Sequence, residues 1–327
     1  MEIINGKSLS EMCDYSFGDH LGGLDPEHLP GGHMMPANAY NSDFLTRCEE
    51  FARKYVDGKE IPAKTMTLFI DNIRLYPRSI IADNENDARW VAYIMSNNNL
   101  LGLCSLLPHN KFVIFCSHED TPIDDKINIP DNVLAIHAVN AEYFNEKIHP
   151  FPYGLQRPIE RGDVPDLRLP IMKERVLEDK HAIPNKLLYV NCGIERHEER
   201  KPLAMFEGLD WVTCRFDKDS KFFPYDKYNN FLDELQNHKF MVCPKGHGLD
   251  CHRNWESLYL RRVPVMLKSP YFTRLMDGFP VLFIDKWSDI TKELLEQNNH
   301  LFEQAQVMSL KKLDLDLIFK TIVQSYG

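Results

Sequence analysis

The chain has 327 residues, of which 43% are hydrophobic and 26% charged, and its 38 basic and 48 acidic side chains give a net charge of −10. This length allows one large domain or two of ordinary size, and the negative balance argues against non-specific binding to nucleic acid or to an anionic membrane. No apolar run approaches the roughly 20 residues of a membrane-spanning helix, and the N-terminus has no apolar segment of signal-peptide type, so we expect a soluble cytoplasmic protein.

Apolar segments that end at polar turns predict the strands of the first half of the chain. Residues 64–71 alternate between apolar and polar side chains before a polar turn, as a half-buried strand does. Residues 111–116 and 133–139 are continuous apolar runs, which are typical of buried parallel strands. Helical patterns cover residues 42–56 and 85–97.

The same alternation of strands and helices continues in the second half and predicts an α/β protein with two open parallel sheets. Strands are expected at residues 186–191, 212–214, 240–243, 263–267 and 281–284, and helices at 171–181, 197–207, 225–237, from 251 onward and 288–308. A polar, proline-interrupted stretch at 156–170 separates the two halves. We therefore expect one domain over residues 1–160, a second over 161–310 and a final segment over 311–327.

The most informative segment joins the strand at 240–243 to the strand at 263–267. A glycine-spaced loop leaves the first strand and runs into the start of a helix, and its polar or glycine positions are Lys245, Gly246, Gly248, Asp250, His252 and Arg253. Glycines let a ligand approach the backbone, and the helix start offers unpaired N–H groups and about half a positive charge. This segment therefore predicts an anion site.

Arg253 and Glu256 admit two interpretations. In the first, Arg253 and the loop amides bind a diphosphate, and Glu256 accepts hydrogen bonds from sugar or ribose hydroxyls. In the second, the loop is an ordinary turn followed by a surface Arg–Glu pair. The helix pattern places Glu256 away from the core-facing Trp255, so the first interpretation expects it to face a cleft.

Polar residues at the ends of other predicted strands are further candidates, because ligands of open α/β sheets gather beyond the carboxyl ends of strands. A general base could come from the group that follows the strand at 111–116, namely His118, Glu119 and Asp120. Capping of a helix or turn is the alternative role for each. Asn191 ends another strand, and Arg200 is either a second cation for phosphate or part of a solvated charged helix.

The sequence predicts no metal site. His197-Glu198 does not continue into H-E-x-x-H, because position 201 is lysine. Asp314 and Asp316 have the D-x-D spacing of a metal site, but alternating leucines around them indicate ordinary amphipathic structure. The eight cysteines are scattered without a C-x-x-C pair, which favours buried free thiols over disulfides or zinc.

Residues 240–291 resemble the exostosin-like glycosyltransferases of family 47 and their viral and microbial relatives. The matching residues are Cys-Pro-Lys-Gly-His-Gly at 243–248, Asp250, His-Arg at 252–253, Trp-Glu-Ser-Leu at 255–258, Pro-Val at 264–265 and 280–281, and Trp-Ser-Asp-Ile at 287–290. Weaker matches lie at 137–155 and around 189–191 with Arg200. The family often has Ser-Pro-Arg before Trp-Glu, and of these residues only the arginine, Arg253, carries over securely.

The resemblance implies a GT-B architecture, in which two Rossmann-like domains face each other across a cleft. It implies that residues 1–160 bind a glycan acceptor, that residues 161–310 bind a UDP-sugar, and that residues 311–327 form a helix crossing back to the first domain. The expected activity is an inverting transfer of a hexose or pentose to an acceptor hydroxyl in glycan biosynthesis, without a metal or other cofactor.

Under this interpretation Asp120, Glu119 or His118 is the base, and the donor contacts are Asn191, Arg200, Lys245, Gly246, Gly248, Asp250, His252, Arg253 and Glu256. Two alternatives remain open from the sequence. One is a non-catalytic nucleotide- or glycan-binding module, and the other is a metal-dependent sugar transferase of the single-domain GT-A type.

Overall fold

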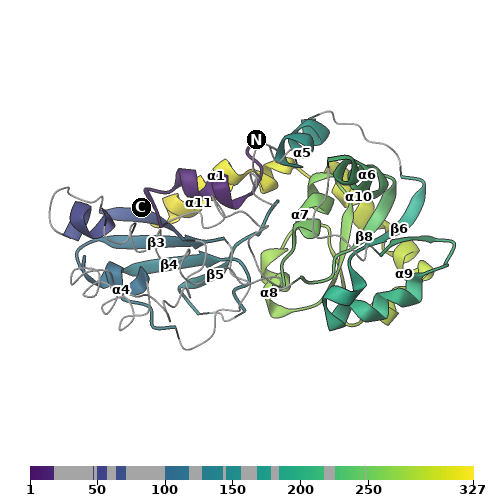
Figure 1. Cartoon of the computed structure of the whole chain (residues 1–327), viewed down its shortest axis with the longest axis horizontal. Coiled ribbons are helices and arrows are strands. Elements are labelled where there is room, and N and C mark those ends of the chain that lie inside the picture. The colour runs from purple at the N-terminus through teal and green to yellow at the C-terminus, as the bar shows by residue number, and fades with distance from the viewer. Residues whose placement is uncertain are drawn as a thin grey trace, which may run out of the picture.

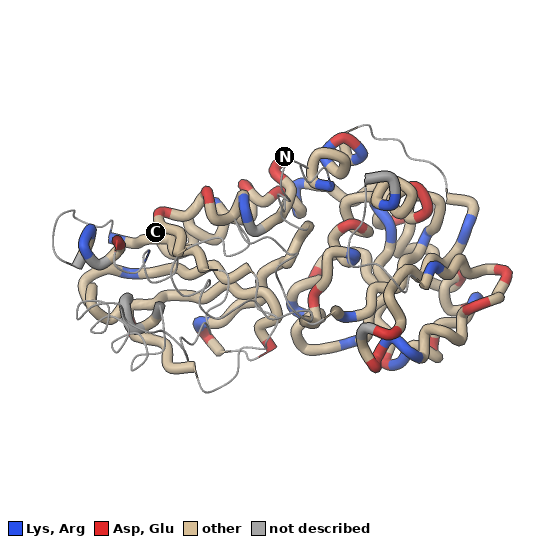
Figure 2. The backbone as a smooth tube through the Cα atoms, in the orientation of Figure 1, with Lys and Arg blue, Asp and Glu red and all other residues tan. Residues whose placement is uncertain are grey.

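The structure is a computed structural model that describes residues 1–17, 47, 50–56, 64–70, 100–117, 127–142, 145–155, 168–177, 184–216, 225–246 and 248–327. Two five-stranded parallel sheets lie toward opposite ends of an elongated molecule (Figure 1). This arrangement confirms the expected α/β fold class with two Rossmann-like sheets. Acidic and basic residues are interspersed along the described chain (Figure 2), so an anion site has to be built from individual residues.

The first sheet belongs to the N-terminal half, and its strands follow one another in chain order. They are β1 (Tyr15–Ser16), β2 (Thr65–Ile70), β3 (Lys111–Cys116), β4 (Val133–Ala138) and β5 (Ile148–Pro150), and each pairs in parallel with the next. The apolar residues of β2, β3 and β4 are almost all buried, as their continuous apolar sequences predict. The described helices of this half are α1 (Gly6–Met12), η2 (Ala52–Val56) and α4 (Leu100–Ser105).

The second sheet has the order β10-β9-β8-β6-β7. Its strands are β6 (Lys186–Asn191), β7 (Val212–Arg215), β8 (His238–Val242), β9 (Val263–Leu267) and β10 (Leu282–Ile284). Read from β7, this is the 2-1-3-4-5 order of flavodoxin-like folds, in which the connections reverse direction between the first and third strands. The reversal falls between β6 and β8, and ligands of such sheets bind beyond the carboxyl ends of the strands at that point.

The helices of the second half are α5 (Arg168–Leu177), η3 (Ile194–Arg196), η4 (Glu198–Phe206), α6 (Tyr225–Gln236), α7 (His252–Tyr259), α8 (Pro270–Leu275), η5 (Trp287–Asp289), α9 (Lys292–Gln297), α10 (Asn299–Val307), η6 (Leu310–Leu313) and α11 (Leu315–Ser325). The second half contains the predicted helical segments, but the helix predicted at 288–308 is divided into η5, α9 and α10, and η3, α8 and η6 were not predicted. The segment predicted as a helix at 197–207 is a 3₁₀ helix that contains Pro202, which lacks the N–H that an α-helix interior needs. The predicted helix at 85–97 lies outside the described residues.

The last helix packs against the first sheet, beside α1 (Figure 1). The ring of Phe319 lies 5.1 Å from that of Phe115 on β3, measured between centroids. Asp314 caps α11 by accepting a hydrogen bond from the Asp316 N–H at 3.2 Å, and it also accepts one from the Glu2 N–H at 3.2 Å. The D-x-D pair is therefore a helix cap.

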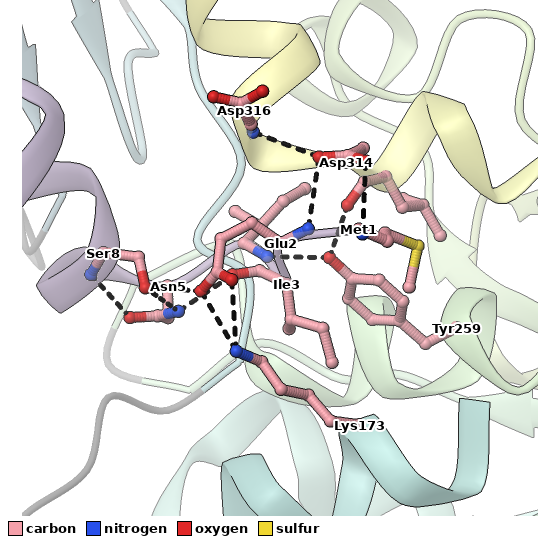
Figure 3. A network of polar contacts seen from close by, with 11 residues as sticks. Met1, Glu2, Ile3, Asn5, Ser8, Lys173, Tyr259, Asp314 and Asp316 are labelled. Carbon is pink, nitrogen blue, oxygen red and sulfur yellow. Dashed lines mark hydrogen bonds and ion pairs between the residues drawn. The ribbon is translucent and has the colours of Figure 1, made fainter. Parts of the chain in front are cut away.

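The N-terminal segment connects the two halves through a polar network (Figure 3). The Ile4 N–H donates to the hydroxyl of Tyr259 at 2.8 Å, and that hydroxyl donates to the Leu313 carbonyl at 2.7 Å. Lys173 on α5 pairs with Glu2 at 3.1 Å. Residues 1–5 thus contact helices of the second half while leading directly into α1 of the first.

A buried histidine on β4 lies against the end of α11. His137 is 7% exposed and stacks against His149 at 5.0 Å, and its Nε2 lies 3.4 Å from the hydroxyl of Tyr326. Burial, together with the nearby His149, lowers the pKa of His137 to about 3. In the unfolded chain this histidine binds a proton near pH 6.5, whereas in the folded chain it stays neutral down to about pH 3. The free energy of unfolding therefore decreases as the pH falls below about 6.5.

We expect His137→Phe to remove this part of the acid sensitivity, because a phenyl ring can stack but does not titrate. One pKa unit corresponds to about 1.4 kcal/mol, and the unfolded histidine is already half protonated at pH 6.5. Between pH 6.5 and 4.5 the wild type should therefore lose about 2 kcal/mol of unfolding free energy relative to the variant. Urea denaturation at these two pH values measures the difference. Replacing the exposed His300 by Gln is the matched control. Equal acid sensitivity of His137→Phe and the wild type would contradict the assignment.

Candidate functional site

The glycine-spaced loop lies where the order of the second sheet reverses. It follows β8, while Gly193 follows β6, and Arg200 connects the two segments. The Nε of Arg200 donates to the Lys245 carbonyl at 2.7 Å, and its Nη1 donates to the Gly193 carbonyl at 3.4 Å. The loop is therefore held at the position where sheets of this order bind ligands.

Arg200 is 5% exposed, which excludes the solvated-helix interpretation of this residue. Its Nη2 would lie 3.7 Å from a Cβ placed on Gly246, so the guanidinium lies directly against the loop. Lys245 forms an ion pair with Glu199, and the Lys245 Nζ lies 2.8 Å from the Glu199 Oε2. Arg200 thus holds the loop through its hydrogen bond to the Lys245 carbonyl and places a buried positive charge next to it.

The first-turn N–H groups of helix α7 donate no hydrogen bond to the side chain of the N-cap residue. Cys251 makes no capping hydrogen bond, whereas Ser269 and Thr291 cap α8 and α9 in the ordinary way. First-turn N–H groups without a side-chain acceptor are suited to an anionic ligand.

Arg253, in the first turn of α7, has a buried donor for which the described part of the chain offers no acceptor. Its Nε is inaccessible to solvent and has no hydrogen-bond partner among the described residues. Buried donors are normally satisfied, and an unsatisfied one costs about 1–3 kcal/mol. Burial raises the pKa of Cys192, which follows β6, and the charge of Arg253 opposes that rise. Arg253 therefore keeps hydrogen-bonding capacity at the N-terminus of α7.

Glu256 is buried, so the expectation that it faces a cleft is corrected. Its side chain is 8% exposed and accepts a hydrogen bond from the Tyr228 hydroxyl on α6 at 3.0 Å. Burial raises the pKa of Glu256, while the charge of Arg253 opposes the rise. The helix period places Glu256 one turn beyond His252, but it does not show that α6 covers that face.

Asp250 joins the two halves of the molecule instead of lying open to a ligand. It is 3% exposed, and its carboxylate accepts hydrogen bonds from the N–H of Tyr153 at 2.9 Å, the amide of Asn254 at 2.7 Å and the indole N–H of Trp255 at 3.0 Å. Burial raises its pKa to about 7, although these donors favour the charged form. The geometry gives Asp250 a structural role, in place of the predicted donor contact.

His252 and Asn191 also make protein contacts. The His252 ring stacks on Tyr153 with centroids 4.3 Å apart, and its Nδ1 lies 2.9 Å from the Gly154 carbonyl. Asn191 donates to the Tyr189 hydroxyl at 2.8 Å. His252 therefore belongs to the junction, and Asn191 borders the loop site at the end of β6.

The carboxyl ends of the two sheets meet at this junction. Asn140 follows β4 and Tyr153 follows β5, and both bond to Asp250 beyond the end of β8. The loop therefore lies close to the carboxyl end of the first sheet as well. The candidate bases His118, Glu119 and Asp120 come directly after β3 and Ser117, outside the described residues, so their role stays a prediction.

Three residues of the site were not among the predicted contacts, namely Asn140, Tyr153 and Tyr228. Asn140 follows a strand as the predicted candidates do, so its position was a usable signal. Tyr153 and Tyr228 act through contacts between segments far apart in the chain, for which the local sequence has no signal.

Among the described residues, no group of three or more His, Cys, Asp or Glu side chains is placed to hold a metal ion. None of the described helices combines the length and apolarity that a bilayer crossing needs.

No protein-family model and no curated protein matches the sequence. Among solved structures, the chain is similar to the crystal structure of an alpha1,3-fucosyltransferase, with a TM-score of 0.38 and 11% sequence identity, over 79% of this chain and 87% of that one. This likeness is too weak to assign a function, which has to be inferred from the residues of the site.

Proposed function

We propose that the chain is a glycosyltransferase whose nucleotide-sugar donor places its diphosphate between the loop that follows β8 and the N-terminus of α7. The observation that carries the proposal is the buried Nε of Arg253, which has no acceptor among the described residues. A diphosphate oxygen would supply that acceptor through a charge-assisted hydrogen bond once the side chain turns its Nε, which is inaccessible to solvent in this structure, toward the loop. The start of α7, without a side-chain cap, and the buried Arg200 beneath the loop add further positive potential.

The chemistry of sugar transfer fits these groups. The departing nucleoside diphosphate carries developing negative charge, which preorganised N–H groups and guanidinium groups stabilise. The acceptor hydroxyl must lose its proton to a base, for which Asp120, Glu119 and His118 at the end of β3 are our candidates.

The finer features of the proposal rest on the resemblance to the exostosin-like enzymes. They are a UDP-sugar donor, a glycan acceptor bound by the first half, and inversion at the anomeric carbon. Metal independence has a physical argument of its own, since Arg253, Arg200 and the helix dipole can together neutralise a diphosphate.

Thermal unfolding with UDP-, GDP- and CMP-sugars tests the donor class. A ligand at about 100 times its dissociation constant stabilises by roughly 2.7 kcal/mol, and we expect the UDP-sugar set to give the largest shift, unchanged by EDTA. A shift that requires Mn²⁺ would contradict metal independence, and no shift with any nucleotide would contradict the proposal. Release of UDP in the presence of glycan acceptors then separates a transferase from a non-catalytic binding module.

A further inference from the structure

One residue of the first half reaches directly into the loop of the second. Asn140, immediately beyond β4, accepts a hydrogen bond from the Asp250 N–H through its Oδ1 at 2.8 Å. Asn140 is 2% exposed and has a φ of 55°, a left-handed conformation that asparagine tolerates better than most residues. Its own N–H donates to the hydroxyl of Tyr271 on α8 at 3.1 Å, so its backbone is held independently of its side chain.

Gly248 shows how closely the Asn140 side chain lies against the loop. A Cβ built on Gly248 would lie 2.1 Å from the Asn140 Nδ2, and its three nearest neighbours are all atoms of the Asn140 side chain. Such a distance requires movement, and moving this amide would break its hydrogen bond to Asp250. Glycine at 248 and asparagine at 140 are therefore matched to each other.

We propose that Asn140 is a positioning residue that orders the diphosphate-binding loop from the opposite domain, so that the donor site is complete only when the two domains are in contact. This inference rests on the proposed function. The side chain acts through the backbone between Gly248 and Asp250 and through the adjoining start of α7, and it is not assigned a contact with the donor. Opening of the junction would then release the loop, which couples donor affinity to the arrangement of the domains.

The test compares UDP binding to the full chain by calorimetry in four proteins, namely the wild type, Asn140→Gly, Gly248→Ala and the double variant. Glycine accepts the φ of residue 140 and retains the N–H bond to Tyr271. Loss of one hydrogen bond predicts UDP binding about threefold to tenfold weaker in Asn140→Gly. Gly248→Ala should weaken binding in the wild-type background and add less than about twofold in the Asn140→Gly background. Independent, additive losses would overturn the coupling.

Tyr259→Phe is the matched control for a merely structural role. It removes both buried hydrogen bonds of the Tyr259 hydroxyl, from the Ile4 N–H and to the Leu313 carbonyl, at the end of α7 opposite the loop. We expect it to lower the melting temperature as Asn140→Gly does, while UDP affinity stays within about twofold of the wild type. If Asn140→Gly behaves as this control does, Asn140 is only structural and the proposal is overturned.

Hydrogen–deuterium exchange of the loop peptides in the absence of ligand separates this proposal from the donor assignment. Amides from 245 to 251 should exchange faster in Asn140→Gly than in Tyr259→Phe or the wild type. If the wild type binds no UDP but the exchange differs as expected, the proposed function fails and the ordering of the loop by Asn140 stands. If loop exchange is the same in all three proteins, the ordering by Asn140 is refuted, whether or not UDP binds.

Discussion

Replacing Asp250 by alanine is expected to lower the unfolding free energy by about 4 kcal/mol. The carboxylate satisfies three separate donors, namely the Tyr153 N–H, the Asn254 amide and the Trp255 indole, all in a buried junction. Each buried donor left unpaired costs about 1–3 kcal/mol, and the loss is reduced where water enters the space. Because the donors come from both halves, the loss should be seen as weaker association of the two domains as well as a lower melting temperature.

Chemical denaturation at neutral pH measures this effect, with two further variants for comparison. Asp250→Asn keeps one acceptor oxygen and should fall between the wild type and Asp250→Ala. Asp316→Ala removes an exposed aspartate that pairs with Lys320 on α11, and we expect it to cost less than about 1 kcal/mol. A loss below about 1 kcal/mol in Asp250→Ala would show that the junction does not depend on this carboxylate.

Arg253→Ala should weaken UDP binding by about 1.5–3 kcal/mol, which is roughly a tenfold to 150-fold increase in the dissociation constant. The guanidinium places a donor with no described partner beside the loop, and Arg253→Ala would delete the charge-assisted hydrogen bond that we propose it makes to the diphosphate. The fold should survive, since the lost Nε makes no hydrogen bond within the described residues.

Calorimetric titration of UDP checks this result against two controls. Arg253→Lys keeps the charge without the planar donor geometry and should lose part of the affinity. Arg47→Ala removes an exposed cation of the first half, paired with Glu50, and should leave UDP affinity unchanged. Unchanged affinity in a folded Arg253→Ala variant would remove Arg253 from the site.

The sequence predicted the central strands well because their signal is local. β3 and β9 occupy the predicted residues, since parallel strands covered on both faces are continuous apolar runs. The three-residue strand β5 was missed, because Ile-His-Pro is too short to show a pattern. The 3₁₀ helix η4 was predicted only as a helix, although Pro202 was a visible reason for a different geometry.

The site was predicted in part, and the missing part depends on contacts between distant segments. The loop after β8 and the start of α7 lie where the sequence placed them, whereas the buried Nε of Arg253, which has no partner among the described residues, was not predicted. The burial of Glu256 comes from Tyr228 on α6, and that of Asp250 from Tyr153 in the other half. Helix periodicity shows which residues share a face, but it cannot show which neighbour covers that face.

A crystal structure of the full chain with UDP is the most direct test of the central claim. We predict that the diphosphate lies within hydrogen-bonding distance, about 3 Å, of the Arg253 guanidinium and of backbone N–H groups at the loop or the start of α7. A nucleotide bound elsewhere, or a diphosphate that leaves the Arg253 Nε without an acceptor, would contradict it.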